Sequence, residues 1–527
     1  MDVQRRVADR WWFVALGATL LLGLVLRLKG IHDPILDHPG WRQGDTAAIA
    51  RNFATLDFNP FHPQADYDGP PPNYVELELQ IVPFLAATMY KIFGIHEIFG
   101  RLISICFSLG TIAVVGYFAR WMFASRIAGI VAAVAFAIYP GSAYYGRTFT
   151  PDTTMAFFLT AAVFASARWI VDEEMRFGTG FWCAAGLTAL ALLAKPVAIM
   201  GLVPIGVTMF AARGLAGTLR APLAYAFFAI ALVPYVCYDA YVRSIAEWHW
   251  ASGITALHVI PALRDSFVSV AGFGTKIAGF GHALGMLYDT MLGRVGLVVL
   301  MFAIVFQARS RAPSRATPLL YGWLGAALAY AYVVVTVERV DYYLYPFLPL
   351  AAVWTGGFAI ALTRYVPPNY RRVLAGAGAA VAIFALVSGQ RAVAAYYRFP
   401  KAAFARAKAL DATLAPNALI VMGHYDPSVL YYIHRKGWEE DPYLWTPLDE
   451  ESAIAKGARS FIAVEPKRLA RNKELSNWLL RFPLENSEGA WPVYETDPAK
   501  ILPGAEARWQ AFRRAEKSHA AGVTVRP

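Results

Sequence analysis

The sequence predicts an all-α polytopic membrane protein that carries a small C-terminal α/β domain. Of the 527 residues, 57% are hydrophobic and only 16% are charged, whereas about 25% of the residues of a soluble domain are charged. Apolar runs of membrane-span length recur along the chain, and the mean hydropathy is +0.41. The net charge is +11. Most lysines and arginines lie between the apolar runs, where they set orientation and contact anionic lipid, so we expect no nucleic-acid partner.

About eleven apolar segments are long enough to cross a membrane, which takes roughly 20 helical residues. Asp289 and Arg294 interrupt the eighth segment. The stretch Ile81–Phe93 is short for a span, which predicts an interfacial or re-entrant helix. No small-residue cleavage site follows the first apolar run, which predicts an uncleaved anchor. The predicted spans are residues 11–28, 102–123, 127–145, 153–170, 178–194, 196–212, 221–238, 287–307, 317–336, 342–363 and 373–390.

Arginine clusters between the spans predict the orientation of the chain. If Ile81–Phe93 is not a span, every cluster falls on one side of the membrane, and the positive-inside rule makes that side cytoplasmic. The clusters are Arg5, Arg6 and Arg10; Arg120 and Arg126; Arg168 and Arg176; Arg213 and Arg220; Arg309, Arg311 and Arg315; and Arg364, Arg371 and Arg372.

The opposite, extracytoplasmic face then gathers the isolated charged groups. Charges at a membrane boundary are costly unless they are solvated or paired, so we expect a shared polar cavity on this face. It holds the first loop with its interfacial helices (29–101), the turn 146–152, the Lys195-Pro196 turn, the segment 241–283, the turn 337–341 and everything after Gln390.

The tail changes character and predicts a separate extracytoplasmic α/β domain. It is more charged than the rest, with strand-like runs at 418–422 and 461–464 and a helical stretch at 400–414. We therefore expect a transmembrane domain over 1–390 and an α/β domain over 391–527. We find no Walker-type loop, no GxGxxG after a strand and no Cys/His zinc spacing, which argues against ATP-driven transport. The three cysteines lie in apolar spans and are expected to pack there.

Asp45 is the most informative single residue. It lies in the stretch 36–51 (LDHPGWRQGDTAAIAR), next to Trp41, Arg42 and Gln43 and before an Ala-rich helical run. A carboxylate at a membrane surface beside a cation could act as a base on a bound hydroxyl. It could equally cap the helix from Thr46 onward, because Asp is favoured at that position.

Ordered motifs around Asp45 resemble those of the GT-C polyprenyl-phosphate-sugar transferases. The motifs are WRQGDTAAIARNF, YYGRTFTPDTTMAFF, LLAKPVA and VERVDYYLYPFLPLAAV, followed by LYYIHRKGW in the tail. The chain is most similar to the bacterial branch related to protein O-mannosyltransferases and lipid A aminoarabinose transferases. This resemblance implies that Asp45 is catalytic and that Asp152 is a second acidic site residue. The chain departs from many relatives at Pro70–Pro72, which leaves the acceptor open.

The resemblance also implies a sugar donor linked by phosphate to a polyprenol. Transfer needs a base, positive groups for the departing phosphate, and exclusion of water. The phosphate candidates are Arg147, Lys195 and Arg339 at extracytoplasmic span ends, with Arg42 beside Asp45. The alternative for the three span-end cations is a snorkelling side chain that sets helix depth.

Most of the further polar residues have more than one interpretation. Asp152 follows Pro151 at a helix start and could only cap it. Glu76 and Glu78 could bind substrate, an amine or a metal, or form a solvated pair. Tyr342 and Tyr343 could contact substrate or belong to an interfacial aromatic belt. His62 is expected to be a loop histidine. A divalent metal between Asp45 and a second carboxylate stays open, because no diagnostic ligand set is present.

The sequence thus predicts an inverting glycosyltransferase in the inner (plasma) membrane with its site on the periplasmic face. The acceptor could be lipid A, another glycolipid, a cell-envelope glycan or a protein. The alternative is a flippase or transporter of a lipid-linked sugar. A transporter is expected to carry ionisable residues near the middle of several spans. Here most of the predicted spans lack ionisable residues near their middle, which favours the enzyme.

Overall fold

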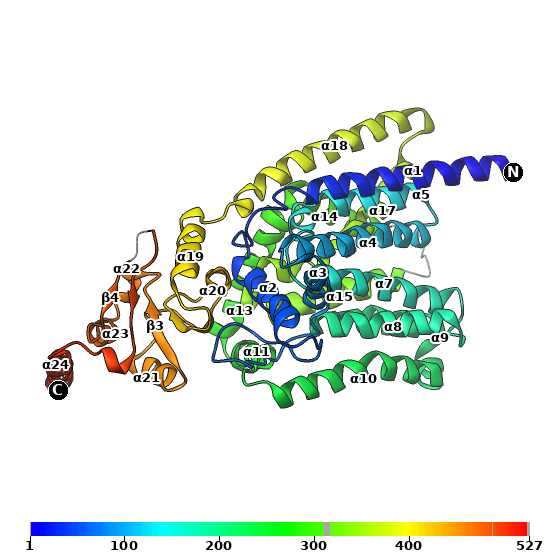
Figure 1. The fold of residues 1–527 in the computed structure, drawn as a ribbon. Helices are drawn as coiled ribbons and strands as arrows, with labels where there is room; N and C mark the ends of the chain where they lie inside the picture. Colours follow the sequence, from blue (N-terminus) through cyan, green and yellow to red (C-terminus); the bar gives the residue numbers. More distant parts are fainter. Residues whose placement is uncertain (1, 310–316, 487–488, 524–527) are drawn as a thin grey trace. The chain divides into compact units, whose positions relative to one another are not determined.

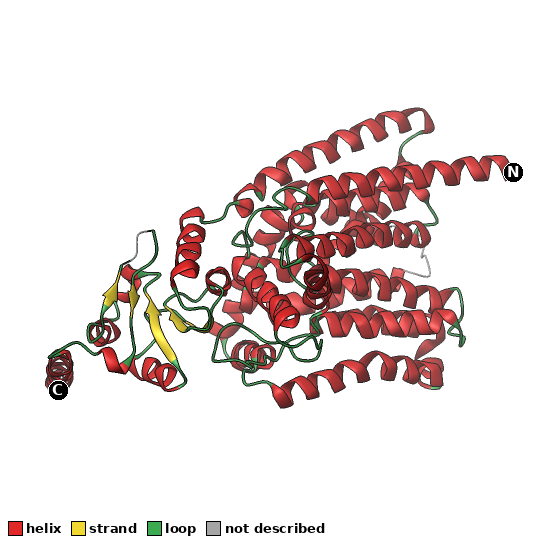
Figure 2. Ribbon diagram, viewed as in Figure 1, coloured by secondary structure: helices red, strands yellow, loops and turns green. Residues whose placement is uncertain are grey.

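The computed structural model describes residues 2–309, 317–486 and 489–523, and these residues form mainly helices with one small sheet (Figures 1 and 2). Arg311 and Arg315, two members of a predicted cytoplasmic cluster, lie outside the described residues. The predicted class, a polytopic helical membrane protein with a small α/β domain, is confirmed.

The chain divides into two compact units, which we call the helical unit and the mixed unit. The helical unit contains the described residues up to 33, 76–245 and 249–397. The mixed unit contains 34–75, 246–248 and the described residues from 398 onward. The division differs from the predicted domain boundaries, because residues 34–75 fold with the tail. Asp45 therefore belongs to the mixed unit.

The long helices of the first half of the helical unit run side by side (Figure 1). The chain breaks where proline requires it. Pro140 separates α5 from α6 because it cannot donate the next helical hydrogen bond. Pro196 forces Lys195 into an extended conformation, so α8 ends at Ala194. The elements are α1 (Asp2–Arg27), α3 (Ile81–Phe93), α4 (Ile98–Met122), α5 (Arg126–Ile138), α6 (Pro140–Tyr145), α7 (Asp152–Val171), α8 (Thr179–Ala194), η1 (Pro196–Gly201), α9 (Leu202–Leu219) and α10 (Pro222–Ile245).

The second half of the helical unit is more irregular. Gly293 has a φ of +73°, a conformation that glycine adopts readily, and it lies where the chain bends by 117° between Val270–Met291 and Gly293–Phe306. The elements are α11 (Trp250–Ile254), η2 (Thr255–Val259), α12 (Ile260–Val268), α13 (Val270–Met286), η3 (Leu287–Met291), α14 (Gly293–Arg309), α15 (Thr317–Tyr330), η4 (Ala331–Val335), α16 (Thr336–Glu338), η5 (Asp341–Leu344), α17 (Phe347–Tyr365), η6 (Pro368–Tyr370), α18 (Arg371–Ala392) and η7 (Ala394–Tyr397).

Fewer helices than eleven have span length. Among the described residues, eight helices are long and apolar enough to cross a membrane, or nine if the bent pair is one span. Two predicted spans correspond to the shorter apolar helices α5 and α8, and the predicted span 287–307 crosses the bend. The segment Ile81–Phe93 is a single 13-residue helix, as expected for a short apolar stretch.

Small residues let the helices of this unit approach closely. A Cβ on Gly129 would lie 2.6 Å from the carbonyl oxygen of Gly116, and one on Gly356 would lie 2.4 Å from that of Ala128. These contacts join α4 to α5 and α5 to α17, in the manner of membrane helix packing.

The mixed unit contains a five-stranded sheet in the order β2-β1-β3-β5-β4. Strand β1 is parallel to β2 and β3, whereas β5 is antiparallel to β3 and β4. The predicted strands and the predicted tail helix correspond to β1, β3 and α19. The elements are α2 (Gly40–Thr55), α19 (Lys401–Thr413), β1 (Leu419–Met422), α20 (Pro427–Ile433), β2 (Lys436–Glu439), α21 (Pro447–Ala455), β3 (Ala458–Ile462), α22 (Pro466–Leu469), α23 (Lys473–Leu479), β4 (Leu484–Glu485), β5 (Val493–Tyr494), η8 (Pro498–Lys500) and α24 (Ala505–Val523).

An apolar core stabilises the tail of the mixed unit. Val421, Phe461 and Trp478 are almost completely buried in one cluster of side chains from the sheet and its helices. Burial of such side chains is the main favourable contribution to folding.

Candidate active site

Asp45 is the sixth residue of α2, which begins at Gly40. The alternative that Asp45 caps this helix is wrong. A capping side chain has to lie at the start of the helix, next to the backbone N–H groups that have no partner within the helix. Its side chain is 5% exposed, and Oδ2 lies 3.7 Å from Nη1 of Arg42, one helical turn earlier. The helix thus presents a buried carboxylate with a cation beside it.

Other carboxyl groups of the mixed unit surround Asp45. Burial raises the pKa of the Tyr67 phenol, and Asp45, which accepts its hydrogen bond, raises it further. Burial together with Asp45 and Glu440 raises the pKa of Asp68 to about 7. The pKa of Glu439 is raised well above its usual value by burial and by the charges of Asp68 and Asp45. Some of these carboxyl groups therefore hold protons close to neutral pH.

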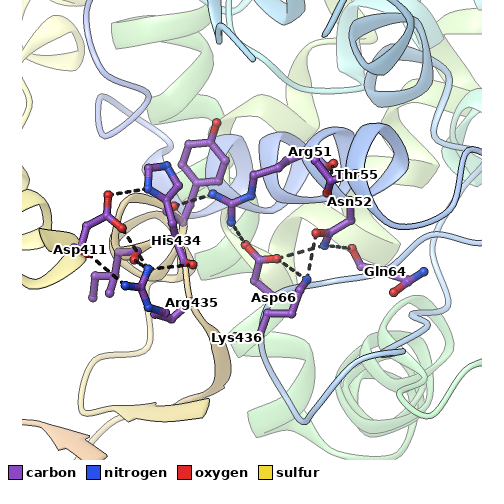
Figure 3. A network of polar contacts seen from close by, with 11 residues as sticks. Arg51, Asn52, Thr55, Gln64, Asp66, Asp411, His434, Arg435 and Lys436 are labelled. Atoms are coloured by element: carbon purple, nitrogen blue, oxygen red, sulfur yellow. Dashed lines mark hydrogen bonds and ion pairs between the residues drawn. The ribbon is translucent and has the colours of Figure 1, made fainter. Parts of the chain in front are cut away.

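A polar network holds the C-terminal half of α2 in the mixed unit (Figure 3). Arg51 and Lys436 both pair with Asp66, with 2.9 Å between Nζ of Lys436 and Oδ1 of Asp66. Asn52 donates to the same oxygen at 3.0 Å, and Arg51 also donates to the carbonyl oxygen of Tyr431 at 2.9 Å. Burial alone would raise the pKa of Asp66, but Arg51 and Lys436 lower it to about 2. The carboxylate of Asp66 is thus ionised and joins α2 to β2.

Glycine lets α2 lie directly against the start of α20. A Cβ on Gly44 would lie 2.5 Å from the Cα of Ser428, which no real side chain could do. Gly44 immediately precedes Asp45, so this contact fixes the helix beside the candidate base.

In the helical unit, Lys195 and Asp152 form a buried ion pair. The distance from Nζ of Lys195 to Oδ1 of Asp152 is 2.6 Å, and the two side chains are 13% and 1% exposed. The N-cap of α7 is Pro151 and Asp152 is the first helical residue, so Asp152 does not occupy the capping position. Lys195, a predicted phosphate-binding cation, thus has an acidic partner 43 residues away in the sequence.

Two tyrosines enclose this ion pair. The ammonium group of Lys195 lies 5.3 Å from the ring centre of Tyr342 and 5.1 Å from that of Tyr343. Tyr342 is 1% exposed, which does not fit the predicted interfacial belt. Aromatic faces stabilise a cation electrostatically, so the four side chains form one local group.

Arg147 is fully buried elsewhere in the helical unit. It donates to the carbonyl oxygen of Gly30 at 3.2 Å, and its guanidinium lies over the rings of Tyr144 and Tyr397. A snorkelling side chain would reach the lipid headgroups, so this alternative is wrong for Arg147. Arg339 is exposed at the left-handed end of α16.

Glu76 and Glu78 are not a solvated pair, because both are buried. Glu76 lies 3.0 Å from Nε of Arg243 and accepts a hydrogen bond of 2.6 Å from the hydroxyl of Ser252. These contacts connect it to α10 and α11. The backbone carbonyl of Glu78 accepts a hydrogen bond from Tyr238. His62 lies in a loop, as expected, and Nδ1 is 2.5 Å from Asp57.

Asp341, within the VERVD motif, was not predicted as a site residue. This buried carboxylate accepts hydrogen bonds from the hydroxyls of Tyr145 at 2.5 Å and Tyr396 at 2.6 Å. The Asp66 network and the carboxyl groups around Asp45 were not predicted either. The relevant motifs were visible, but the pairings join residues far apart in the chain.

The structure brings several of the predicted site residues together within each unit. Arg42 and Asp45 lie together in the mixed unit, whereas Asp152, Lys195, Tyr342 and Tyr343 lie together in the helical unit. Glu76 belongs to the contact with Arg243. Within the described ranges, no group of three or more His, Cys, Asp or Glu side chains is arranged to hold a metal ion.

Comparison with known sequences gives one family match. Residues 80–238 match the model of a family described as dolichyl-phosphate-mannose-protein mannosyltransferase. No curated protein matched the chain.

Solved structures with the same fold cover nearly the whole chain. ArnT from Cupriavidus metallidurans bound to undecaprenyl phosphate has a TM-score of 0.60 at 14% identity, over 93% of this chain and 99% of that one. AglB, an oligosaccharyltransferase from the archaeon Archaeoglobus fulgidus, was solved with an inhibitory peptide and a dolichol-phosphate. It has a TM-score of 0.58 at 14% identity, over 94% of this chain and 75% of that one. At this level of identity the likeness concerns the fold. The family match covers residues 80–238, less than a third of the chain, and its description names a glycosyltransferase, the kind of enzyme that the ordered motifs predict.

Proposed function

We propose that this protein transfers a sugar from a polyprenyl-phosphate donor to an acceptor hydroxyl or amine, with Asp45 as the general base. The observation that carries the proposal is the buried carboxylate of Asp45, oriented by Arg42 and Tyr67. The donor class is supported by the lipid phosphates in the ArnT and AglB structures. The mannosyltransferase family description points in the same direction.

Asp45 would remove the acceptor proton as the acceptor attacks the anomeric carbon. Arg42 and Tyr67 contact this carboxylate from two sides, and a base held in this way contributes to proton transfer. Direct attack by the acceptor on the face opposite the phosphate inverts the anomeric configuration. A general acid is not needed, because a lipid phosphate leaves as an anion, unlike the leaving group in most glycosidases.

Lys195 is our first candidate for binding the donor phosphate. It keeps a small exposed fraction, and its ammonium is a compact charge that can exchange part of its contact with Asp152 for a phosphate oxygen. Arg147 is the second candidate, although it is already occupied by Gly30 and two tyrosines. Arg339 could contact phosphate from its exposed position. A positive charge beside the donor phosphate stabilises the departing lipid phosphate as the glycosidic bond breaks.

The protein would act in the inner membrane with its site on the periplasmic face. The arginine clusters between the spans support this orientation through the positive-inside rule. The acceptor would be an envelope component, namely lipid A, another glycolipid, a glycan or a protein. A divalent metal remains a hypothesis, and no step above depends on one.

The test compares envelope glycolipids and glycans by mass spectrometry in cells that lack the protein and carry a plasmid copy. The parent should restore one sugar-modified product. Asp45→Asn should lower its rate of formation about 10²–10⁴-fold, because a positioned base is lost. Asp57→Asn, a loop substitution in the same unit, is the control and should restore the product. Equal restoration by Asp45→Asn would contradict the proposed role of Asp45.

A further inference from the structure

The mixed unit contains a cavity lined by residues that the proposed transfer does not use. The cavity has a volume of about 470 Å³, within the range of about 300–1,000 Å³ for small-molecule sites. Its polar lining includes Arg406, His424, Asp426 and Ser428, and its apolar lining includes Leu36 and Trp491. We propose that this cavity binds a neutral saccharide unit of the acceptor, an inference that rests on the proposed function.

The sheet topology places the cavity where open α/β sheets bind ligands. Strand β1 lies between β2 and β3 and is parallel to both. The chain thus passes from β1 to its neighbour β2 on one side and then crosses to β3 on the other side of β1. Ligands bind outside the carboxyl ends of parallel strands at such a switch point. His424 and Asp426 lie shortly after β1, which ends at Met422, and Val464 lies shortly after β3, which ends at Ile462. All three line the cavity.

The side chains around the cavity suit a neutral, hydroxyl-rich ligand. A sugar ring presents hydroxyls at its edge and C–H groups on its faces, so it needs donors, acceptors and an apolar surface together. Arg406 supplies donors, Asp426 supplies an acceptor, and Trp491 supplies apolar surface. The negative charge of Asp426 disfavours a strongly anionic ligand.

Two lining residues are prepared for hydrogen bonding. Nδ1 of His424 lies 2.5 Å from Oε1 of Glu465, so this contact sets the orientation of the imidazole ring. Ser428 is fully buried, and within the described part of the chain its hydroxyl has no hydrogen-bond partner. Buried hydroxyls are usually paired, and a ligand hydroxyl would supply the missing partner.

The cavity and the candidate base lie in the same unit and are connected through Ser428. Ser428 lines the cavity and also lies against Gly44, the residue before Asp45. The backbone N–H of Ser428 donates to Oδ1 of Asp426 at 2.9 Å, which fixes this turn. A saccharide held here would therefore be held by the same unit that presents Asp45.

The test measures binding of neutral disaccharides to the full chain in nanodiscs by ligand-observed NMR. The probes are disaccharides of glucose, mannose, galactose and N-acetylglucosamine. Ser428→Ala removes a hydroxyl that makes no hydrogen bond within the described residues, and Arg406→Ala removes an exposed side chain, so both variants should fold. Each should weaken disaccharide binding about 3- to 10-fold, the effect of one hydrogen bond. The matched controls, Ser452→Ala and Arg471→Ala, are exposed elsewhere in the unit and should bind like the parent.

Sugar transfer from a polyprenyl-phosphate donor to an envelope lipid extract, measured in parallel, separates this inference from the proposed function. Weaker disaccharide binding in Ser428→Ala and Arg406→Ala, with sugar transfer by the parent, supports the inference. Parental disaccharide affinity in both variants overturns it, and so does binding of inorganic phosphate without binding of any disaccharide. Disaccharide binding with no sugar transfer by the parent overturns the proposed function and the acceptor role, while the saccharide site itself stands.

Discussion

Asp68 is a single carboxyl group that reports on the surroundings of Asp45. Its pKa is about 7, raised by burial and by the charges of Asp45 and Glu440. The folded state therefore keeps a proton on Asp68 between about pH 4 and pH 7, where the unfolded chain has lost it. Stability falls as pH rises through this window and is constant above it, because the folded state binds more protons.

We predict that Asp68→Asn flattens the pH dependence of the melting temperature between pH 4 and pH 7. The parent should lose a few kcal/mol of stability across this window, since one pKa unit corresponds to about 1.4 kcal/mol. Asn is a suitable replacement because Asp68 has a φ of +69°, a conformation that Asn tolerates. The control, Glu485→Gln, changes an exposed carboxylate. A parental slope in Asp68→Asn would show that Asp68 is ionised throughout.

Single residues also show what one sequence can and cannot predict. Asp45 was predicted because it lies in a polar stretch that resembles a family motif. Its neighbours Tyr67 and Glu439 were not, because one lies in an irregular loop and the other almost 400 residues away. The pairing of Lys195 with Asp152 was not predicted either, because these two residues are also distant in the sequence. A sequence shows which charges are present, but pairing depends on how distant segments pack.

At the scale of elements, the ion pair between Lys195 and Asp152 joins the end of α8 to the start of α7. Removing one member leaves the other charge buried and unpaired, which typically costs 3–5 kcal/mol. Lys195→Met and Asp152→Asn should therefore each lower the melting temperature. The double variant should recover most of the loss, because it removes both charges.

Donor affinity in the same variants tests whether Lys195 also binds phosphate. Lys195→Met and the double variant should both bind a polyprenyl-phosphate sugar about tenfold or more weakly, since a charge-assisted hydrogen bond contributes about 1.5–3 kcal/mol. Asp152→Asn keeps the cation and should retain affinity. The measurement is donor binding in nanodiscs. Parental affinity in the double variant would show that the pair serves only to hold α7 and α8 together.

Helices and strands were predictable where one sequence pattern dominates a segment. The apolar run at 418–422 predicted β1 closely and the helical stretch 400–414 predicted α19, whereas the run at 461–464 overlaps only the end of β3, which begins at Ala458. The predicted span 127–145 contains Pro140, where α5 has already ended. The span 287–307 crosses Gly293, where the chain bends. Hydropathy counts apolar residues, but it does not register the backbone breaks that proline and glycine introduce.

At the scale of the whole molecule, the proposed orientation places the tail outside the cytoplasm. A C-terminal alkaline phosphatase fusion should then be active, because this enzyme needs the oxidising periplasm for its disulfides. A fluorescent-protein fusion exported by the general secretory route should be dark. The reverse pattern would move every arginine cluster to the periplasmic side and contradict the positive-inside assignment.

The division into units also shows why the domain boundaries were difficult to predict. Residues 34–75 connect a transmembrane helix to a short apolar helix, so their sequence position suggests a loop of the membrane domain. The contacts of Arg51 and Asn52 with Asp66 and Lys436 instead hold α2 in the mixed unit. These four polar side chains determine to which unit the candidate base belongs.

The most direct test of the proposed function is sugar transfer by the purified full chain in nanodiscs. The donor is a synthetic polyprenyl-phosphate sugar, the acceptor is an envelope lipid extract, and released polyprenyl phosphate is measured together with the sugar-modified acceptor. We expect the parent to form both products in equal amounts and Asp45→Asn to slow the formation of both about 10²–10⁴-fold. Movement of intact donor across the bilayer without either product, or equal rates in the two proteins, would contradict it.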